Sequence, residues 1–416
     1  MQQPSTIFKH LLTDRSWFAI ALVALVMPFY FNWSVITIII LLLALISDLM
    51  SWKRLTNFTR TRMLFPMILL YVMYGIGILY STDRAEGLGN LQTKLPLLLF
   101  PVFLSTIDYS KRENTAFVML SFMTGCLLAG LICFCNAIYI WLTTGENHFF
   151  YIEFSIFMHP SYFALYLNFI LCYIYQKLIF EDGVKYVKTP AAVFILFFIN
   201  GLILMLSSKA GIFTAGLVQL IMLIASSIRR KKSRKVISIF LGVALFYFLF
   251  YKVILPDGYE RIAYSERIVM GKPILNTASE SSSLRLLIWK SSLPLVKKSF
   301  LYGTGTGDVK NELLNAYKTN GITAAFEKEL NAHNQFLQTV LAIGLPGLIL
   351  LLFSLVLPFF EGIRKKKYLL YMFPLIMAFN LLFESMLERQ AGVVFFAFFA
   401  TLLIMNNSKR LLIQSK

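Results

Sequence analysis

Apolar runs as long as a membrane-spanning helix recur along this chain. A helix that crosses the hydrocarbon core of a bilayer needs roughly 20 mostly apolar residues. Hydrophobic residues make up 58% of the 416 residues and charged residues only 14%. A water-soluble globule of this composition would expose large apolar patches. The sequence therefore predicts an all-α, polytopic membrane protein.

About twelve transmembrane helices are expected from the positions of these runs. They are expected near residues 16–31, 33–50, 64–80, 92–107, 115–142, 160–180, 190–207, 210–228, 236–255, 336–360, 368–386 and 390–407. The fourth is short, with Lys94, Pro96 and Pro101 inside it. The first apolar run, from Trp17 to Phe31, is interpreted as a retained helix rather than a signal peptide, because no small-residue cleavage site follows it.

Basic residues lie in short clusters between alternate apolar runs. The strongest clusters are at 229–235 and 364–367, whereas the short loops on the other side carry only Arg84, Lys209 and Arg389. Because cytoplasmic loops are enriched in lysine and arginine, this asymmetry predicts that both termini are cytoplasmic. The same clusters explain the net charge of +18 without a nucleic-acid partner.

The four cysteines, Cys126, Cys133, Cys135 and Cys172, all lie inside apolar runs. Their spacing matches neither a zinc site nor a disulfide framework, and buried small side chains are the simpler interpretation. No metal site is therefore expected from the sequence.

Two segments on the outer side are longer than a turn. Residues 143–159 include two histidines and two glutamates. The other segment runs from 256 to 335, and its nearly balanced charges indicate a folded extramembrane element. The expected organisation is transmembrane helices 1–9 in residues 1–255, a loop carrying the site in 256–335, and transmembrane helices 10–12 with a cytoplasmic tail in 336–416.

The large loop contains two predicted helices. The three serines at 281–283 are suited to an N-cap for an amphipathic helix, on which Arg285 and Trp289 share one face. Asp308 could cap a second helix through about Asn320, which Gly321 would end. The loop is therefore expected to be partly helical.

Residues 303–307 read Gly-Thr-Gly-Thr-Gly, which is typical of a turn with unusual backbone angles or close approach to a ligand. A nucleotide-binding loop is excluded, because no strand precedes the segment and no Gly-Lys-Ser/Thr follows it. Two interpretations stay open. One is a tight structural turn, and the other is a backbone nest for phosphate or sugar oxygens.

Lys209, Arg285 and His333 are all expected at the outer membrane boundary, although they come from distant stretches of the chain. Cations at that depth suit the diphosphate of a lipid-linked substrate, which needs charge-assisted hydrogen bonds. An imidazole is suited to act as the base for a sugar hydroxyl. The acidic partner of His333 stays open among Glu153, Glu327, Glu329 and Glu384.

These residues lie in motifs that resemble the O-antigen ligase and polymerase family over roughly residues 155–405. The motifs are His159-Pro160-Ser161-Tyr162, Leu206-Ser207-Ser208-Lys209-Ala210-Gly211, Ser283-Leu284-Arg285 with Trp289, Gly303-Thr304-Gly305, His333-Asn334-Gln335-Phe336, Gly344-Leu345-Pro346-Gly347, and Phe383-Glu384-Ser385 with Gly392. The individual motifs are short, but their order and spacing are fairly specific.

The resemblance implies a metal-independent glycosyltransferase of the bacterial inner membrane, with its large loop in the periplasm and no cofactor. The donor would be an undecaprenyl-diphosphate-linked glycan, embedded among membrane lipids. Arg285 would bind the diphosphate, Lys209 would take the place of a family arginine, and His333 would be the base or orient the acceptor. Lysine keeps the charge of arginine but lacks its bidentate fork. Supporting residues would be Gly303, Gly305, Asn334, Glu384 and His159.

Ligation of a finished glycan to lipid A-core is favoured over polymerisation of lipid-linked repeats, because Arg285, the His333 motif and the Glu384 segment look closest to ligases. Both use the same donor, and the protein-glycosylating branch of the family is a further choice of acceptor. A transporter is disfavoured, because the two halves show no repeat and the ionisable residues cluster at the outer boundary rather than mid-span.

Overall fold

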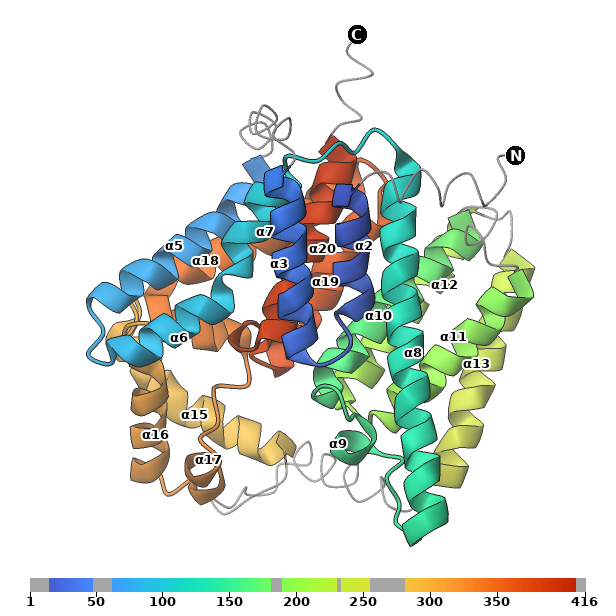
Figure 1. The fold of residues 1–416 in the computed structure, drawn as a ribbon. Coiled ribbons are helices and arrows are strands. Elements are labelled where there is room, and N and C mark those ends of the chain that lie inside the picture. Colours follow the sequence, from blue (N-terminus) through green and yellow to red (C-terminus); the bar gives the residue numbers. More distant parts are fainter. Residues whose placement is uncertain (1–14, 48–61, 181–188, 230–232, 255–280, 409–416) are drawn as a thin grey trace.

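The computed structural model describes residues 15–47, 62–180, 189–229, 233–254 and 281–408 (Figure 1). Within these ranges every regular element is helical. The elements are α2 (Arg15–Val26), α3 (Phe31–Ser47), η2 (Arg62–Leu64), α5 (Phe65–Leu79), α6 (Arg84–Lys94), α7 (Pro96–Leu104), α8 (Arg112–Thr144), α9 (Tyr151–Phe154), α10 (Pro160–Phe180), α11 (Thr189–Met205), α12 (Lys209–Arg229), α13 (Ser233–Ile254), α15 (Ser281–Ser299), α16 (Val309–Thr319), α17 (Thr323–Glu327), α18 (Gln335–Arg364), α19 (Tyr368–Phe383), η3 (Met386–Glu388) and α20 (Gln390–Ser408).

Six helical stretches in the described residues are long and apolar enough to cross a membrane: Arg62–Leu79, Glu113–Thr144, Pro160–Phe180, Lys209–Ser227, Gln335–Arg364 and Gln390–Asn407. Shorter apolar helices accompany them, among them Arg15–Val26 and Tyr368–Phe383. The expected class of helical membrane protein is therefore confirmed, and about twelve crossings stays a prediction. Helices α10 and α20 have most of their residues buried, so they form the centre of the bundle.

The part of the large loop that the structure describes lies at one end of the bundle. In Figure 1, α15, α16 and α17 lie together below α5, α6 and α18, and α9 lies at the same end. Helix α15 packs against α18, and α16 packs against α15 and α17. Residues 256–280 of the expected loop lie outside the described residues.

The helix expected at 92–107 is instead two helices, α6 and α7, separated at Leu95. Pro96 begins α7, because a proline lacks the backbone N–H that a continuous helix would use at that position. Helix α6 also begins earlier than expected, at Arg84, after Asp83 accepts a hydrogen bond of 3.0 Å from the backbone of Glu86. Because the sequence of α6 is polar, apolar runs do not indicate this helix.

Helix α16 begins after Asp308 as expected and ends at Thr319, and Gly321 follows with φ of +68°. However, the expectation that Asp308 caps this helix is wrong. Its carboxylate instead accepts hydrogen bonds from the backbone of Thr82 and Asp83, at 2.8 and 2.9 Å, and from the hydroxyl of Thr82 at 2.8 Å. Asp308 therefore ties the loop to the segment before α6.

Helix α18 is kinked near its middle. Ile343 and Gly344 have non-helical backbone angles, and Gly344 has φ of +67°. After the kink, the amide of Leu345 donates to the carbonyl of Phe300 at 2.8 Å. The Gly-Leu-Pro-Gly motif therefore forms a bend that contacts the end of α15.

The glycine-rich turn packs onto this bend. Gly303 and Gly305 have φ of +78° and +107°, as the sequence predicts. The amides of Thr304 and Gly305 donate to the carbonyls of Leu341 and Ala342, which the kink leaves without helical partners. Because these amides are already bonded to protein, the hydrogen bonds support the tight-turn interpretation rather than the nest.

We expect Gly303→Ala to destabilise the protein. A Cβ at this position would lie 2.5 Å from the backbone of Ala342, and the positive φ alone costs an alanine about 1–2 kcal/mol. The thermal midpoint in detergent measures this effect. Gly89→Ala, in helix α6 with open space around it, is the matched control and should leave the midpoint unchanged or raised. Equal midpoints for Gly303→Ala and the wild type would contradict the docking of this turn.

Candidate functional site

Glu384 joins two of the predicted site residues. It follows the last residue of α19 in an extended conformation, so its side chain leaves the helix direction. One carboxylate oxygen lies 2.9 Å from Nδ1 of His333, and the other accepts a hydrogen bond of 3.3 Å from Arg285. The side chain of Glu384 is only 9% exposed. Of the four carboxylates left open by the sequence, the one in contact with His333 is therefore Glu384.

The backbone around His333 is held in an unusual conformation. His333 has φ of +45°, and its amide donates to the side chain of Asn331 at 3.0 Å. The indole of Trp289 on α15 donates to the carbonyl of Ala332 at 2.9 Å. Strained backbone angles of this kind persist where the surroundings fix them, and they cluster at functional sites. Arg285 and Trp289, one turn apart on α15, thus both hold the site.

Asn334 connects the two halves of the site through its backbone. Its side chain caps α18 by accepting a 3.0 Å hydrogen bond from Leu337, and its amide donates to the hydroxyl of Ser385 at 3.2 Å. The segment that carries His333 is thereby bonded to the segment that carries Glu384. These contacts give Asn334 a structural role beside the site.

The electrostatics favour an ionised Glu384. Burial opposes its charge, but the hydrogen bond from His333 and the positive charges of His333 and Arg285 outweigh burial and lower the pKa of Glu384 to about 2. Burial is also the main cause that lowers the pKa of His159, and the nearby charges of His333, Arg285 and Arg389 lower it further against the attraction of Glu384. His159 is therefore neutral at neutral pH.

A cavity of about 650 Å³ opens beside this cluster. Its polar side is formed by His159, His333, Glu384 and Arg389, together with the 328–331 segment. Its apolar side is formed by Met27, Phe29, Phe157, Met158, Tyr162, Tyr166 and Val394. The cavity therefore offers charged groups and an apolar wall in one space, which suits an amphipathic ligand.

Residues 192–352 match the family model of the O-antigen ligases. The match confirms the family resemblance that the short motifs indicate, and it contains Lys209, Arg285 and His333. Glu384 lies beyond its end, in the last part of the chain. No curated protein was found to match the chain.

Within the matched segment, Arg285 has hydrogen-bond donors that no described residue accepts from. Its Nη2 contacts Glu384, whereas its Nε is buried and has no hydrogen-bond partner among the residues that the structure describes. The side chain is 22% exposed. Arg285 is not among the described residues that line the cavity, and it reaches the site through Glu384. A buried donor without a partner is costly unless a ligand or water completes it.

Lys209 is the first residue of α12, and two residues later Gly211 packs against Ala164 of α10, which lies between the cavity residues Tyr162 and Tyr166. Near its start, α12 is held to α10 by a 2.9 Å hydrogen bond from Asn168 to the carbonyl of Gly211. It is held to α19 by a 3.0 Å bond from Asn380 to the hydroxyl of Thr214. Lys209 does not line the cavity in the described part of the chain. Its predicted contact with a diphosphate stays a prediction.

Arg389 is a cavity residue that the sequence alone does not single out. From the charge pattern it is only one of the few basic residues in the outer loops. The structure places it on the cavity wall, five residues after Glu384 in the loop between α19 and α20. The sequence feature that could have indicated Arg389 is that one short loop contains both Glu384, an acidic motif residue, and an isolated arginine.

Proposed function

We propose that this protein is a metal-independent glycosyltransferase of the bacterial inner membrane. It moves a glycan from undecaprenyl diphosphate to a hydroxyl of lipid A-core on the periplasmic face. The observation that carries this proposal is the contact of His333 and Arg285 with Glu384 beside an amphipathic cavity. The O-antigen ligase match supports the same class of reaction.

His333 is suited to act as the general base. An ionised carboxylate can only accept hydrogen bonds, so Glu384 places the proton of the neutral imidazole on Nδ1. Nε2 then carries the lone pair and has no hydrogen-bond partner among the described residues. It takes the proton of the acceptor hydroxyl, and Glu384 stabilises the imidazolium that results.

The departing diphosphate requires positive charge. The acceptor oxygen bonds to the anomeric carbon while the bond from that carbon to the diphosphate oxygen breaks, and the electron pair leaves with undecaprenyl diphosphate. Arg285 offers unused N–H donors next to Glu384, and Arg389 lies on the cavity wall. Lys209 at the start of α12 supplies further charge. Fixed cations at a developing negative charge lower the barrier without reorganisation.

We expect Arg285→Ala to lower glycan transfer by about 10²–10³-fold, which is typical of losing one preorganised donor to a developing anion. Arg285→Lys should keep part of the activity, because lysine retains the charge but not the fork. Membranes that contain equal amounts of inserted protein provide the measurement, with lipid-linked glycan as donor. Wild-type levels of product from Arg285→Ala would remove this residue from the mechanism.

The lipids of a deletion strain test the choice of acceptor. Loss of a ligase leaves long polymer attached to the lipid carrier, whereas loss of a polymerase leaves single repeats on the carrier or on lipid A-core. We expect the long polymer. Single-repeat products would instead assign polymerisation, with the same donor chemistry at the same residues.

A further inference from the structure

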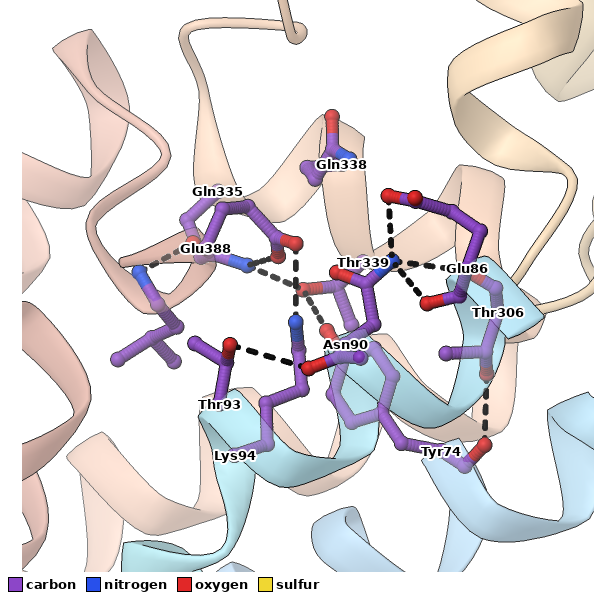
Figure 2. Close-up of polar contacts among 12 residues, drawn as sticks. Tyr74, Glu86, Asn90, Thr93, Lys94, Thr306, Gln335, Gln338, Thr339 and Glu388 are labelled. Atoms are coloured by element: carbon purple, nitrogen blue, oxygen red, sulfur yellow. Dashed lines mark hydrogen bonds and ion pairs between the residues drawn. The ribbon is translucent and has the colours of Figure 1, made fainter. Parts of the chain in front are cut away.

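A second, smaller cavity lies next to the proposed site. It has a volume of about 150 Å³, and its lining includes Lys94, Glu388 and Tyr74. Both cavities are lined by residues 329–331, so this short segment separates them. The polar side chains around the smaller cavity are drawn in Figure 2.

A buried ion pair forms one wall of the smaller cavity. Nζ of Lys94 lies 2.9 Å from Glu388, and the two side chains are only 1% and 12% exposed. The same ammonium group lies 4.6 Å from the ring centre of Tyr74. Lys94 is the last residue of α6, where Pro96 interrupts the path into α7. The helix break therefore places a lysine against a segment almost 300 residues away.

Glu388 belongs to the same short segment as Glu384. Gln335 clamps the end of this segment. The side-chain nitrogen of Gln335 donates a hydrogen bond to Glu388 at 3.0 Å, and its side-chain oxygen accepts a 2.7 Å hydrogen bond from the backbone N–H of Leu387. Figure 2 shows Lys94 and Gln335 converging on the Glu388 carboxylate. At the other end of the segment, Glu384 holds His333. Residues 333–335 and 384–388 are thus bonded along their length, from the His333–Glu384 contact at one end to the Lys94–Glu388 ion pair at the other.

We propose that Lys94 is a positioning residue for glycan transfer, a role that rests on the function proposed above. Its ion pair with Glu388 fixes the segment from 384 to 389, and through that segment the Glu384 carboxylate that holds His333. Breaking a buried pair leaves the remaining charge uncompensated. Without Lys94, Glu388 would turn toward water, and the clamp at Gln335 and the contact at His333 would loosen.

Another lysine at the same cavity provides the matched control. Lys310 pairs with Glu329, but the side chains in this pair are 44% and 59% exposed. Exposed ion pairs contribute little to stability, because water replaces the lost partner. Lys310→Met and Lys94→Met therefore remove the same ammonium group from the same cavity. Only Lys94→Met leaves a buried carboxylate, that of Glu388, without its lysine partner.

Hydrogen–deuterium exchange of the purified full-length protein tests the positioning directly. In Lys94→Met we expect peptides that cover residues 384–389 to exchange at least about tenfold faster, since local opening sets amide exchange. Lys310→Met should match the wild type. Unchanged exchange in Lys94→Met would overturn the proposal. This readout needs no substrate, so it remains decisive even if the wild type transfers no glycan, a result that would instead refute the proposed function.

Transfer rates then show whether Lys94 acts through Glu384. We expect Lys94→Met to lower kcat by about tenfold with little change in the KM for the donor. The double variant Lys94→Met/Glu384→Gln should be no slower than Glu384→Gln alone, because residues that act as one unit are not additive. If the double variant instead shows the product of the two single-variant reductions in transfer rate, Lys94 acts independently of Glu384, and the proposal is overturned.

Discussion

Replacing His333 by asparagine is expected to lower glycan transfer by about 10²–10⁴-fold, the usual contribution of a positioned general base. Asparagine tolerates the positive φ of this position, so the turn before α18 should keep its shape. Its amide cannot accept a proton from the acceptor hydroxyl. The loss should therefore fall on kcat, with the KM for the lipid-linked donor nearly unchanged.

His148→Asn is the matched control for His333→Asn. His148 also lies beside a carboxylate, 3.3 Å from Glu146, but this pair is in an exposed loop and lines neither of the two cavities described above. The rates are measured with equal amounts of inserted protein. A His333→Asn variant that transfers glycan at the wild-type rate would exclude His333 as the base, and equal losses from both variants would point to a general effect on the protein.

The class of the protein and the order of its helices follow from the sequence because hydropathy reports them directly. Apolar runs of helix length can be satisfied only inside a bilayer or a buried core. The helix end at Gly321 and the positive φ of Gly303 were also predictable, because both depend on local backbone chemistry. Topology also predicts Arg285 and His333 at one membrane boundary, and in the structure both contact Glu384.

Hydropathy fails at the fourth expected helix, residues 92–107. Hydropathy finds the apolar residues of α7 but not the polar helix α6 before it. Proline and lysine in one short run mark a break, yet they do not say that Lys94 is buried against Glu388. That partner comes from the far end of the chain, and sequence spacing carries no information about it.

The partner of His333 depends in the same way on tertiary structure. Four carboxylates were expected on the same side of the membrane, and only the extended backbone at Glu384 aims one of them at the imidazole. The glycine turn shows a related limit. Local chemistry predicts its positive φ angles, but its amides bond to carbonyls of Leu341 and Ala342 that only the kink in α18 exposes.

Glu384→Gln is expected to reduce glycan transfer by about 10²-fold or more, because a neutral amide cannot stabilise the imidazolium that forms on His333. Glutamine keeps the size of the side chain, so the effect reports the lost charge rather than a cavity. Glu327→Gln is the control, since Glu327 is an exposed residue of α17 and one of the carboxylates left open by the sequence. Full activity in Glu384→Gln would exclude a carboxylate–imidazole pair from the mechanism.

The same substitution should change how stability depends on pH. Folding lowers the pKa of Glu384 from 4.5 to about 2, which corresponds to about 3 kcal/mol of stability from this carboxylate. The unfolded chain protonates first as pH falls, so the contribution is complete above pH 4.5 and disappears as pH approaches 2. The gap between the thermal midpoints of wild type and Glu384→Gln, measured at one fixed scan rate, should therefore narrow as pH falls from 4.5 toward 2. A difference that stays constant down to pH 3 would show that the carboxylate is not held ionised by His333 and Arg285, because a depressed pKa requires the gap to narrow there.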